Sequence, residues 1–128
     1  EENIHQQFIN GGIDKAVENL IKSEKDAISI LGFSIGGSIA WKAVCRGLKV
    51  DNLRTVSSTR LRYESKKPNC AIGLFYGEND LYKPEDEWFK NFKLSTKIYK
   101  NENHDFYSKK EIAAEICSCF SNNHLENF

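Results

Sequence analysis

The feature that most constrains the fold is an alternation of short aliphatic runs with amphipathic segments. Apolar residues recur at helical spacing from Ile13 to Ile21, and short apolar runs bounded by turn residues follow further along the chain. We expect strands at residues 27–31, 53–57, 71–76 and 96–99, and helices at 13–21, 35–48, from 84 and from 108. Such alternation is typical of a parallel sheet covered on both faces. The pattern therefore predicts a three-layer α/β fold, with a mostly parallel sheet of about four strands and helices on both faces.

Local signals set the ends of several expected elements. Gly32 should close the first strand, and Gly47 could face the sheet from the helix at 35–48. Pro84 suits the first turn of a helix, and the three acidic residues after it suit the positive end of a helix dipole. Ser108 and Glu111 match a capping box that opens the last helix. The polar stretch 58–69 is expected to be an exposed connection ending near Pro68.

Length and charge narrow the classes of function. A chain of 128 residues predicts one domain over residues 1–128, and no apolar run approaches the length of a membrane span. The polar start at Glu1 is unlike a secretory signal, so we expect a cytoplasmic protein without membrane contact. The 18 basic and 18 acidic side chains cancel, which argues against nucleic acid as a partner. The absence of methionine indicates a processed product, an engineered chain or a piece of a longer one.

The four cysteines do not form a disulfide or metal-binding pattern. Cys45 and Cys117 fall on expected helices, Cys70 precedes a strand, and the pair Cys117 and Cys119 lacks metal-ligand spacing. We therefore expect reduced, partly buried thiols and no metal site.

Gly32-Phe33-Ser34-Ile35-Gly36 lies where the first strand passes into the second helix. This is the setting of a nucleophile elbow, in which a strained turn exposes a serine hydroxyl above the sheet. Gly32 and Gly36 are expected to leave room for the turn, and the Ile35 N–H to point toward a developing oxyanion. The plain alternative is a glycine-rich connection without chemistry.

A serine nucleophile needs a base, and the base needs an acid that orients it. Asp80 follows the strand at 71–76, and His104 follows the strand at 96–99, so both should lie at the same edge of the sheet as Ser34. Asp80 could instead be an ordinary turn residue, with Glu78 as the reserve acid. His104 could be an ordinary loop histidine, although His5 and His124 near the termini would make worse bases.

These motifs resemble the α/β-hydrolase family, in particular its small members without a cap that are related to dienelactone hydrolases and acyl esterases. In that family the nucleophile, acid and histidine follow successive strands in this order, and Gly77-x-x-Asp80-x-x-x-Pro84 reproduces a familiar pattern around the acid. The resemblance implies Ser34 as nucleophile, Asp80 as orienting carboxylate, His104 as general acid and base, and the Ile35 N–H as oxyanion donor. It implies no cofactor. Asn101 stands where the family commonly has glycine, and asparagine tolerates similar backbone angles.

The family places four further strands before the helix that precedes the elbow, and this chain has only about a dozen residues there. The loop that normally supplies a second oxyanion donor is therefore missing, which costs roughly a hundredfold or more in rate. Gly11 and Gly12 could offer N–H groups, but a loose connection is the simpler interpretation. The strand at 27–31 would be an exposed edge, which residues 1–10, a second copy of the chain or an upstream segment could cover.

The resulting hypothesis is a serine hydrolase that cleaves a small ester or thioester through an acyl-enzyme on Ser34. Arg60 and Arg62 follow the second strand at the same edge and could bind an acidic group of this small-molecule acyl substrate, or form a solvated basic loop. A catalytically silent binding or assembly module is the rival from another class. An acyltransferase would use the same residues.

Overall fold

The computed structural model describes residues 12–23 and 29–122, and these residues build a parallel sheet. Its strands are β1 (Ser29–Phe33), β2 (Asn52–Val56), β3 (Ala71–Gly77) and β4 (Ser95–Tyr99), and they lie side by side in chain order. Within the described residues, β2 and β3 are central, and β1 and β4 are the edges. The expected sheet is confirmed, and every pairing in it is parallel.

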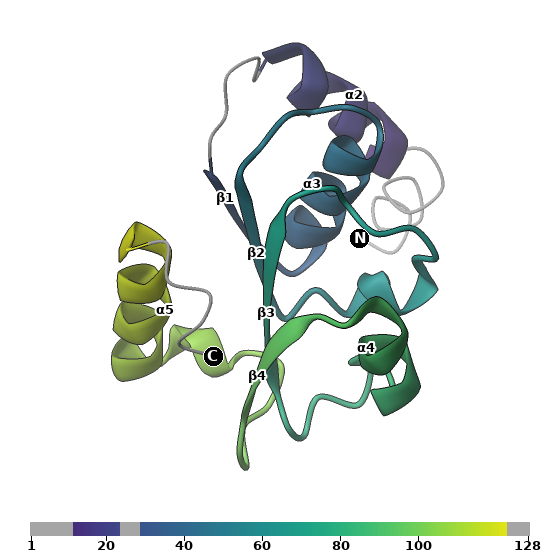
Figure 1. Ribbon diagram of the computed structural model, residues 1–128. Helices are drawn as coiled ribbons and strands as arrows, with labels where there is room; N and C mark the ends of the chain where they lie inside the picture. The colour runs from purple at the N-terminus through teal and green to yellow at the C-terminus, as the bar shows by residue number, and fades with distance from the viewer. Residues whose placement is uncertain (1–11, 24–28, 123–128) are drawn as a thin grey trace.

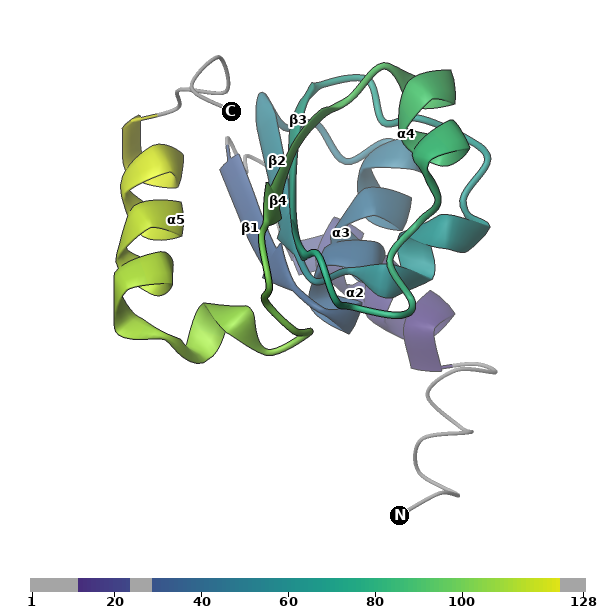
Figure 2. The same ribbon diagram turned by 90° about the horizontal axis from the view of Figure 1, so that it is seen from below.

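Helices cover the sheet on both sides. The helices α2 (Ile13–Ser23), α3 (Ile35–Cys45) and α4 (Asp86–Phe92) lie on one face, and α5 (Lys110–Asn122) lies on the other, as Figures 1 and 2 show. Two short 3₁₀ helices, η2 (Thr59–Tyr63) and η3 (Phe106–Ser108), follow β2 and β4. The predicted three-layer α/β arrangement is therefore confirmed.

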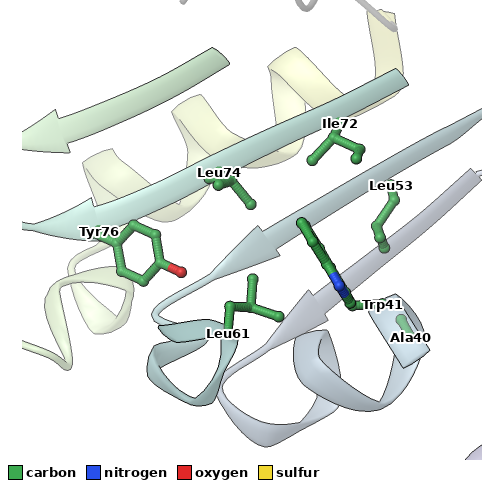
Figure 3. Packing of buried hydrophobic residues seen from close by; sticks show 7 residues of the cluster. All are labelled: Ala40, Trp41, Leu53, Leu61, Ile72, Leu74 and Tyr76. Carbon is green, nitrogen blue, oxygen red and sulfur yellow. The ribbon is translucent and has the colours of Figure 1, made fainter. Parts of the chain in front are cut away.

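The core beneath α3 and α4 is rich in large side chains from the two central strands. Trp41 of α3 is wholly buried and packs with residues of β2, η2 and β3 (Figure 3). Its indole N–H donates to the carbonyl of Lys66 at 3.0 Å, so the one polar atom of the ring is satisfied. Burial of each such side chain contributes about 1.5–3 kcal/mol, so this cluster is a main source of stability. The cluster consists of Ala40, Trp41, Leu53, Leu61, Ile72, Leu74 and Tyr76.

The opposite face has a second core formed by Val56, Phe75, Phe106 and Ile116. Phe106 belongs to η3 and Ile116 to α5, so both elements after β4 are held against the sheet. This packing matters for the site because η3 begins two residues after His104.

Three expected boundaries are wrong for local reasons. The first strand continues through Gly32 to Phe33, while residues 27 and 28 lie outside the described part. The helix expected to reach residue 48 ends at Cys45, and Gly47 is exposed with φ 117°, so it terminates the helix instead of facing the sheet. Helix α4, expected from Pro84, begins at Asp86, and Glu85 is its N-cap residue.

Two expectations for polar segments are also wrong. Ser108 does not cap the last helix, because it ends η3 and its hydroxyl donates to the Asp105 carbonyl at 2.8 Å. The stretch 58–69 is not uniformly exposed, since it contains η2 and buries Ser58 and Leu61 completely. Hydrophobic burial at Leu61 folds this connection back onto the sheet.

No helix in the described part of the chain is long and apolar enough to cross a membrane, and no three potential ligands cluster there around a metal position. Cys45, Cys70 and Cys117 are free thiols, and the surroundings of Cys119 are not described. Cys45 and Cys117 are more exposed than expected, whereas burial raises the pKa of Cys70 to about 11. Cys70 is therefore protonated at neutral pH.

Candidate active site

Ser34, Asp80 and His104 converge at the carboxyl edge of the sheet. Ser34 directly follows β1, Asp80 lies three residues beyond β3, and His104 lies five residues beyond β4. Because all four strands are parallel, the turns that follow them meet at one edge. The fold thus brings together three residues that span 70 positions of the chain.

The three side chains form a connected series. His104 Nδ1 lies 2.7 Å from Asp80 Oδ2, a hydrogen-bonded distance, and His104 Nε2 lies 3.5 Å from Ser34 Oγ. A proton-transfer partner works at roughly 2.6–3.2 Å, and such contacts commonly tighten when substrate binds. The order of hydroxyl, imidazole and carboxylate is the one that the sequence predicted, and the roles of the three groups stay a prediction.

The surroundings of the two ionisable groups differ. The Asp80 side chain is 2% exposed, while the His104 side chain is 45% exposed. The Tyr82 N–H donates to Asp80 Oδ1 at 3.1 Å, so both carboxylate oxygens of Asp80 are held. A buried carboxylate whose two oxygens each have a hydrogen-bond partner suits an orienting role. A partly exposed imidazole suits exchange of protons with a substrate.

The reserve acid, Glu78, occupies a different position. Its carboxylate accepts the Asn101 N–H at 3.0 Å and so ties down the loop that leads to His104. Asn101 has φ 62°, the left-handed conformation for which asparagine is well suited. Geometry therefore favours Asp80 as the partner of His104, while His5 and His124 lie outside the described residues.

The backbone at Ser34 is strained, with φ 51° and ψ −124°. Ser34 occupies the N-cap position of α3, yet its hydroxyl makes no capping hydrogen bond and lies near His104. Serine normally favours this position because its hydroxyl caps the helix. Backbone strain, together with a hydroxyl that contacts His104 and does not cap the helix, is typical of a functional residue.

Ile35 is the first residue of α3, so its N–H has no carbonyl partner within the helix. It lies at the positive end of the helix dipole, beside the Ser34 hydroxyl. Its role as oxyanion donor stays a prediction. Of the other proposed donors, Gly11 lies outside the described residues and Gly12 directly precedes α2.

Of the two glycines expected to be needed for room, Gly32 is tightly packed and Gly36 is not. A Cβ at Gly32 would lie 2.6 Å from the Gly37 Cα, so the close approach expected at Gly32 is real. A Cβ at Gly36 would meet nothing within 4 Å, so the expectation that this position needs glycine for room is wrong. The tight position is Gly37, where a Cβ would collide with the side chains of Ser58 and Thr55.

Three buried hydroxyl groups at this edge were missed by sequence reasoning. Ser57 and Ser58 follow β2, Tyr76 lies on β3, and all three are wholly buried. We call them the buried hydroxyl cluster. The available signal was a pair of hydroxyl residues directly after a buried strand, at the edge where Ser34 was expected.

The two arginines considered for substrate binding lie on η2. The guanidinium of Arg62 donates to the Thr59 carbonyl at 2.9 Å and to the Tyr63 hydroxyl at 2.8 Å. It also lies over the rings of Tyr63 and Tyr82, with a 3.4 Å contact to the Tyr82 carbonyl. We call Arg62, Tyr63 and Tyr82 the exposed arginine–tyrosine cluster. Arg60 lies 5.4 Å from the Tyr63 ring centroid and makes no hydrogen bond within the described residues.

This exposed cluster lines an open groove of about 500 Å³. Leu81 and Tyr82, which directly follow Asp80, form one side, and Trp88 of α4 contributes to the lining. Ser34, Asp80 and His104 are not in the lining. The link between the groove and the three residues is the loop of Asp80, whose next two residues line the groove.

No known family model matches the sequence, and no curated protein is significantly similar to it. Solved structures do match. A protein from Thermoplasma acidophilum described as a CIB-like hydrolase is 22% identical with a TM-score of 0.67, over 91% of this chain and 63% of its own. An α/β-hydrolase-like protein of unknown function from Agrobacterium tumefaciens is 16% identical with a TM-score of 0.64, over 91% of this chain and 58% of its own. An α/β serine hydrolase homologue from Coxiella burnetii is 22% identical with a TM-score of 0.58, over 85% of this chain and 55% of its own.

The chain therefore has the α/β-hydrolase fold, as the sequence resemblance implied. It spans less than two thirds of the length of each of these three structures.

Proposed function

We propose that the chain is a serine hydrolase that cleaves a small ester or thioester. The observation that carries the proposal is the continuous contact from the buried Asp80 carboxylate through the His104 ring to the Ser34 hydroxyl. This contact lies at the edge of the sheet where α/β folds bind their ligands. Solved structures of the same fold include proteins described as hydrolases, which supports the class of reaction.

The proposed reaction has two halves. Ser34 Oγ attacks the acyl carbonyl carbon while its proton passes to His104 Nε2, and the C–O or C–S bond breaks as His104 returns that proton to the leaving alcohol or thiol. Water then attacks the acyl-enzyme, giving its proton to His104, and the acid leaves as Ser34 regains its hydrogen. Asp80 stabilises the imidazolium that forms in each half, and the Ile35 N–H donates to the oxyanion.

The groove beside the Asp80 loop is the proposed position of the leaving group or acyl chain. Its aromatic lining at Tyr63, Tyr82 and Trp88 would contact an apolar portion of the substrate. Of the two arginines, Arg62 lines the groove and Arg60 does not. The Arg62 guanidinium already donates to a carbonyl and a hydroxyl, so we assign neither arginine to an acidic group of the substrate.

A second candidate is a silent module that keeps the fold for binding or assembly. Two observations favour it: the 3.5 Å separation between Ser34 Oγ and His104 Nε2, and the limited share of the matched structures that the chain spans. The two candidates differ in whether Ser34 is activated.

Labelling by a fluorophosphonate separates the candidates. We expect wild type to be labelled at Ser34, and Ser34→Ala to remain unlabelled while folding equally well. His104→Gln should lower the labelling rate at least a hundredfold, because removal of a general base costs about 10²–10⁴-fold. The attachment site is read by mass spectrometry, and p-nitrophenyl acetate reports turnover. Labelling of wild type no faster than of His104→Gln would exclude the hydrolase and favour the silent module.

A further inference from the structure

The two serines after β2 donate hydrogen bonds to the backbone of Ser34 and of His104. The Ser58 hydroxyl donates to the carbonyl of Ser34 at 2.7 Å, and the Ser57 hydroxyl donates to the carbonyl of His104 at 2.6 Å. Both serines are 0% exposed, so their hydroxyl groups are shielded from water and depend on these two acceptors. Adjacent residues can reach partners in two separate loops because Ser57 has φ 55°, which turns the chain sharply as it leaves the strand.

The backbone at the same place adds two further connections. The Ser34 N–H donates to the Val56 carbonyl at 2.7 Å, and the Ser57 N–H donates to the Phe75 carbonyl at 2.8 Å. Ser34 is thus held on both sides of its α-carbon, at the N–H by Val56 and at the carbonyl by Ser58. These anchors belong to the central strands, the least mobile part of a sheet.

Tyr76 holds Ser58 from the other direction. Its hydroxyl donates to the Ser58 carbonyl at 2.9 Å. Burial, and to a lesser extent the nearby charge of Asp80, raises the pKa of Tyr76, so this hydroxyl remains a donor under all ordinary conditions. Gly37 of α3 lies close to the Ser58 side chain, since a Cβ at this position would collide with the Ser58 hydroxyl.

A purely structural turn would not need these features. Glycine would adopt the left-handed conformation at Ser57 without strain, and a buried turn can be closed by backbone bonds alone. Instead, each hydroxyl binds the carbonyl of a residue whose side chain takes part in the proposed reaction. The quantity that these bonds control is the separation of Ser34 Oγ and His104 Nε2, which is 3.5 Å.

We propose that Ser57 and Ser58 are positioning residues that set the separation between Ser34 Oγ and His104 Nε2. Ser58 holds the nucleophile, Ser57 holds the base, and β2 is the common reference for both. As a role in catalysis, this inference rests on the proposed hydrolase function. Misplacement of reacting groups by about 1 Å can cost on the order of a hundredfold in rate, so the loss of either hydroxyl should be visible in the chemical step.

The test uses variants designed to stay folded. Ser57→Gly removes the hydroxyl and relieves the backbone strain, and in Ser58→Ala the Ser34 carbonyl keeps its bond from the Gly37 N–H at 3.1 Å. Ser38→Ala is the matched control, because Ser38 is a buried serine of α3 whose hydroxyl has no partner within the described residues. Circular dichroism and urea unfolding check that each variant folds.

The first readout is labelling by the fluorophosphonate, separated into its binding constant and its maximal rate. We expect the maximal rate to fall about tenfold to a hundredfold in Ser57→Gly and Ser58→Ala, with the binding constant changed less than about twofold and Ser38→Ala unchanged. Folded variants that label at the wild-type rate would overturn the positioning role and leave the hydrolase intact. Failure of Ser57→Gly to fold would also overturn it, in favour of a structural role.

The second readout does not depend on activity. The proton shared by His104 Nδ1 and Asp80 should give a downfield NMR signal. We expect Ser57→Gly to shift or broaden this signal, and Ser58→Ala and Ser38→Ala to leave it in place, because only Ser57 holds the His104 backbone. If wild type is not labelled, the proposed function fails, and this signal alone decides the positioning role: an unchanged signal in Ser57→Gly refutes it.

Discussion

The buried hydroxyl cluster and the exposed arginine–tyrosine cluster both connect the segment after β2 to neighbouring parts of the chain. They use different interactions: buried hydrogen bonds in the first and exposed stacking contacts in the second. The buried cluster makes three short hydrogen bonds of 2.6–2.9 Å from hydroxyl groups of wholly buried residues. The exposed cluster relies on Arg62 stacking against the rings of Tyr63 and Tyr82, two residues that are each 64% exposed. Buried bonds are costly to lose because nothing replaces them, whereas exposed contacts compete with water and salt.

The largest expected difference concerns two adjacent glycines, of which only one touches the buried cluster. Gly37→Ala should destabilise the protein by about 1–3 kcal/mol or more, because the new methyl collides with Ser58 and Thr55. Gly36→Ala meets open space inside α3 and should be neutral or stabilising by up to about 1 kcal/mol. Urea unfolding of the two variants measures the contrast. Equal effects would mean that packing against Ser58 does not distinguish the positions.

Removal of one hydroxyl from each cluster should give a smaller difference. Tyr76→Phe removes one of two donors to the Ser58 carbonyl, which keeps its bond from the Leu61 N–H at 3.2 Å, so the free energy of unfolding should fall by about 0.5–1.5 kcal/mol. Tyr82→Phe should cost almost nothing, because the Tyr82 hydroxyl makes no hydrogen bond within the described residues and its ring stays in place. A loss in Tyr82→Phe as large as that in Tyr76→Phe would remove the distinction between the clusters.

The stability difference between wild type and Tyr76→Phe should also depend on pH. The folded protein keeps Tyr76 protonated, since burial and Asp80 raise its pKa, while an unfolded tyrosine ionises near about pH 10. The contribution of Tyr76 is therefore complete below about pH 10 and declines as the pH rises further. Urea unfolding at pH 8 and pH 10.5 should show the stability difference between wild type and Tyr76→Phe shrinking. A constant difference would contradict a raised pKa.

The smallest effect is expected for Arg62→Ala. It removes exposed stacking and hydrogen bonds at the protein surface, which should cost less than about 1 kcal/mol. Thermal unfolding at low and high salt measures this cost. Lys42→Ala is a useful reference, because it removes another partly exposed cation, which pairs with Glu64 at 2.7 Å. A large loss in Arg62→Ala alone would mean that the exposed cluster is structurally essential.

The fold could be predicted because its signals are local. The aliphatic runs that became β1 to β4 and the helical spacing from Ile13 indicate the α/β alternation without knowledge of contacts. The meeting of Ser34, Asp80 and His104 was also predictable, because parallel strands place the residues that follow them at one edge. Their order along the chain then matched a known family pattern.

The remaining features depend on contacts between distant segments. The burial of Ser57 and Ser58 results from loops 47 and 24 residues away, so nothing in their immediate neighbours indicates it. The choice of Gly37 over Gly36 as the tight position depends on the side from which Ser58 approaches α3. The expected cap at Ser108 failed because packing of Phe106 against the sheet places Ser108 in η3. Tertiary packing decides each of these, and local propensity does not.

The strand order has a consequence for how the molecule assembles. Within residues 29–122, β2, β3 and β4 each pair with the strand that immediately precedes them in the sequence. During synthesis, domains generally fold from the N-terminal side, and segments that are nearer in the sequence meet sooner than distant ones. The turn with Ser34 can therefore be shaped by β2 while the rest of the chain is still emerging. His104 follows β4, so it can lie beside Ser34 only after β4, the last strand of the described residues, has joined the sheet.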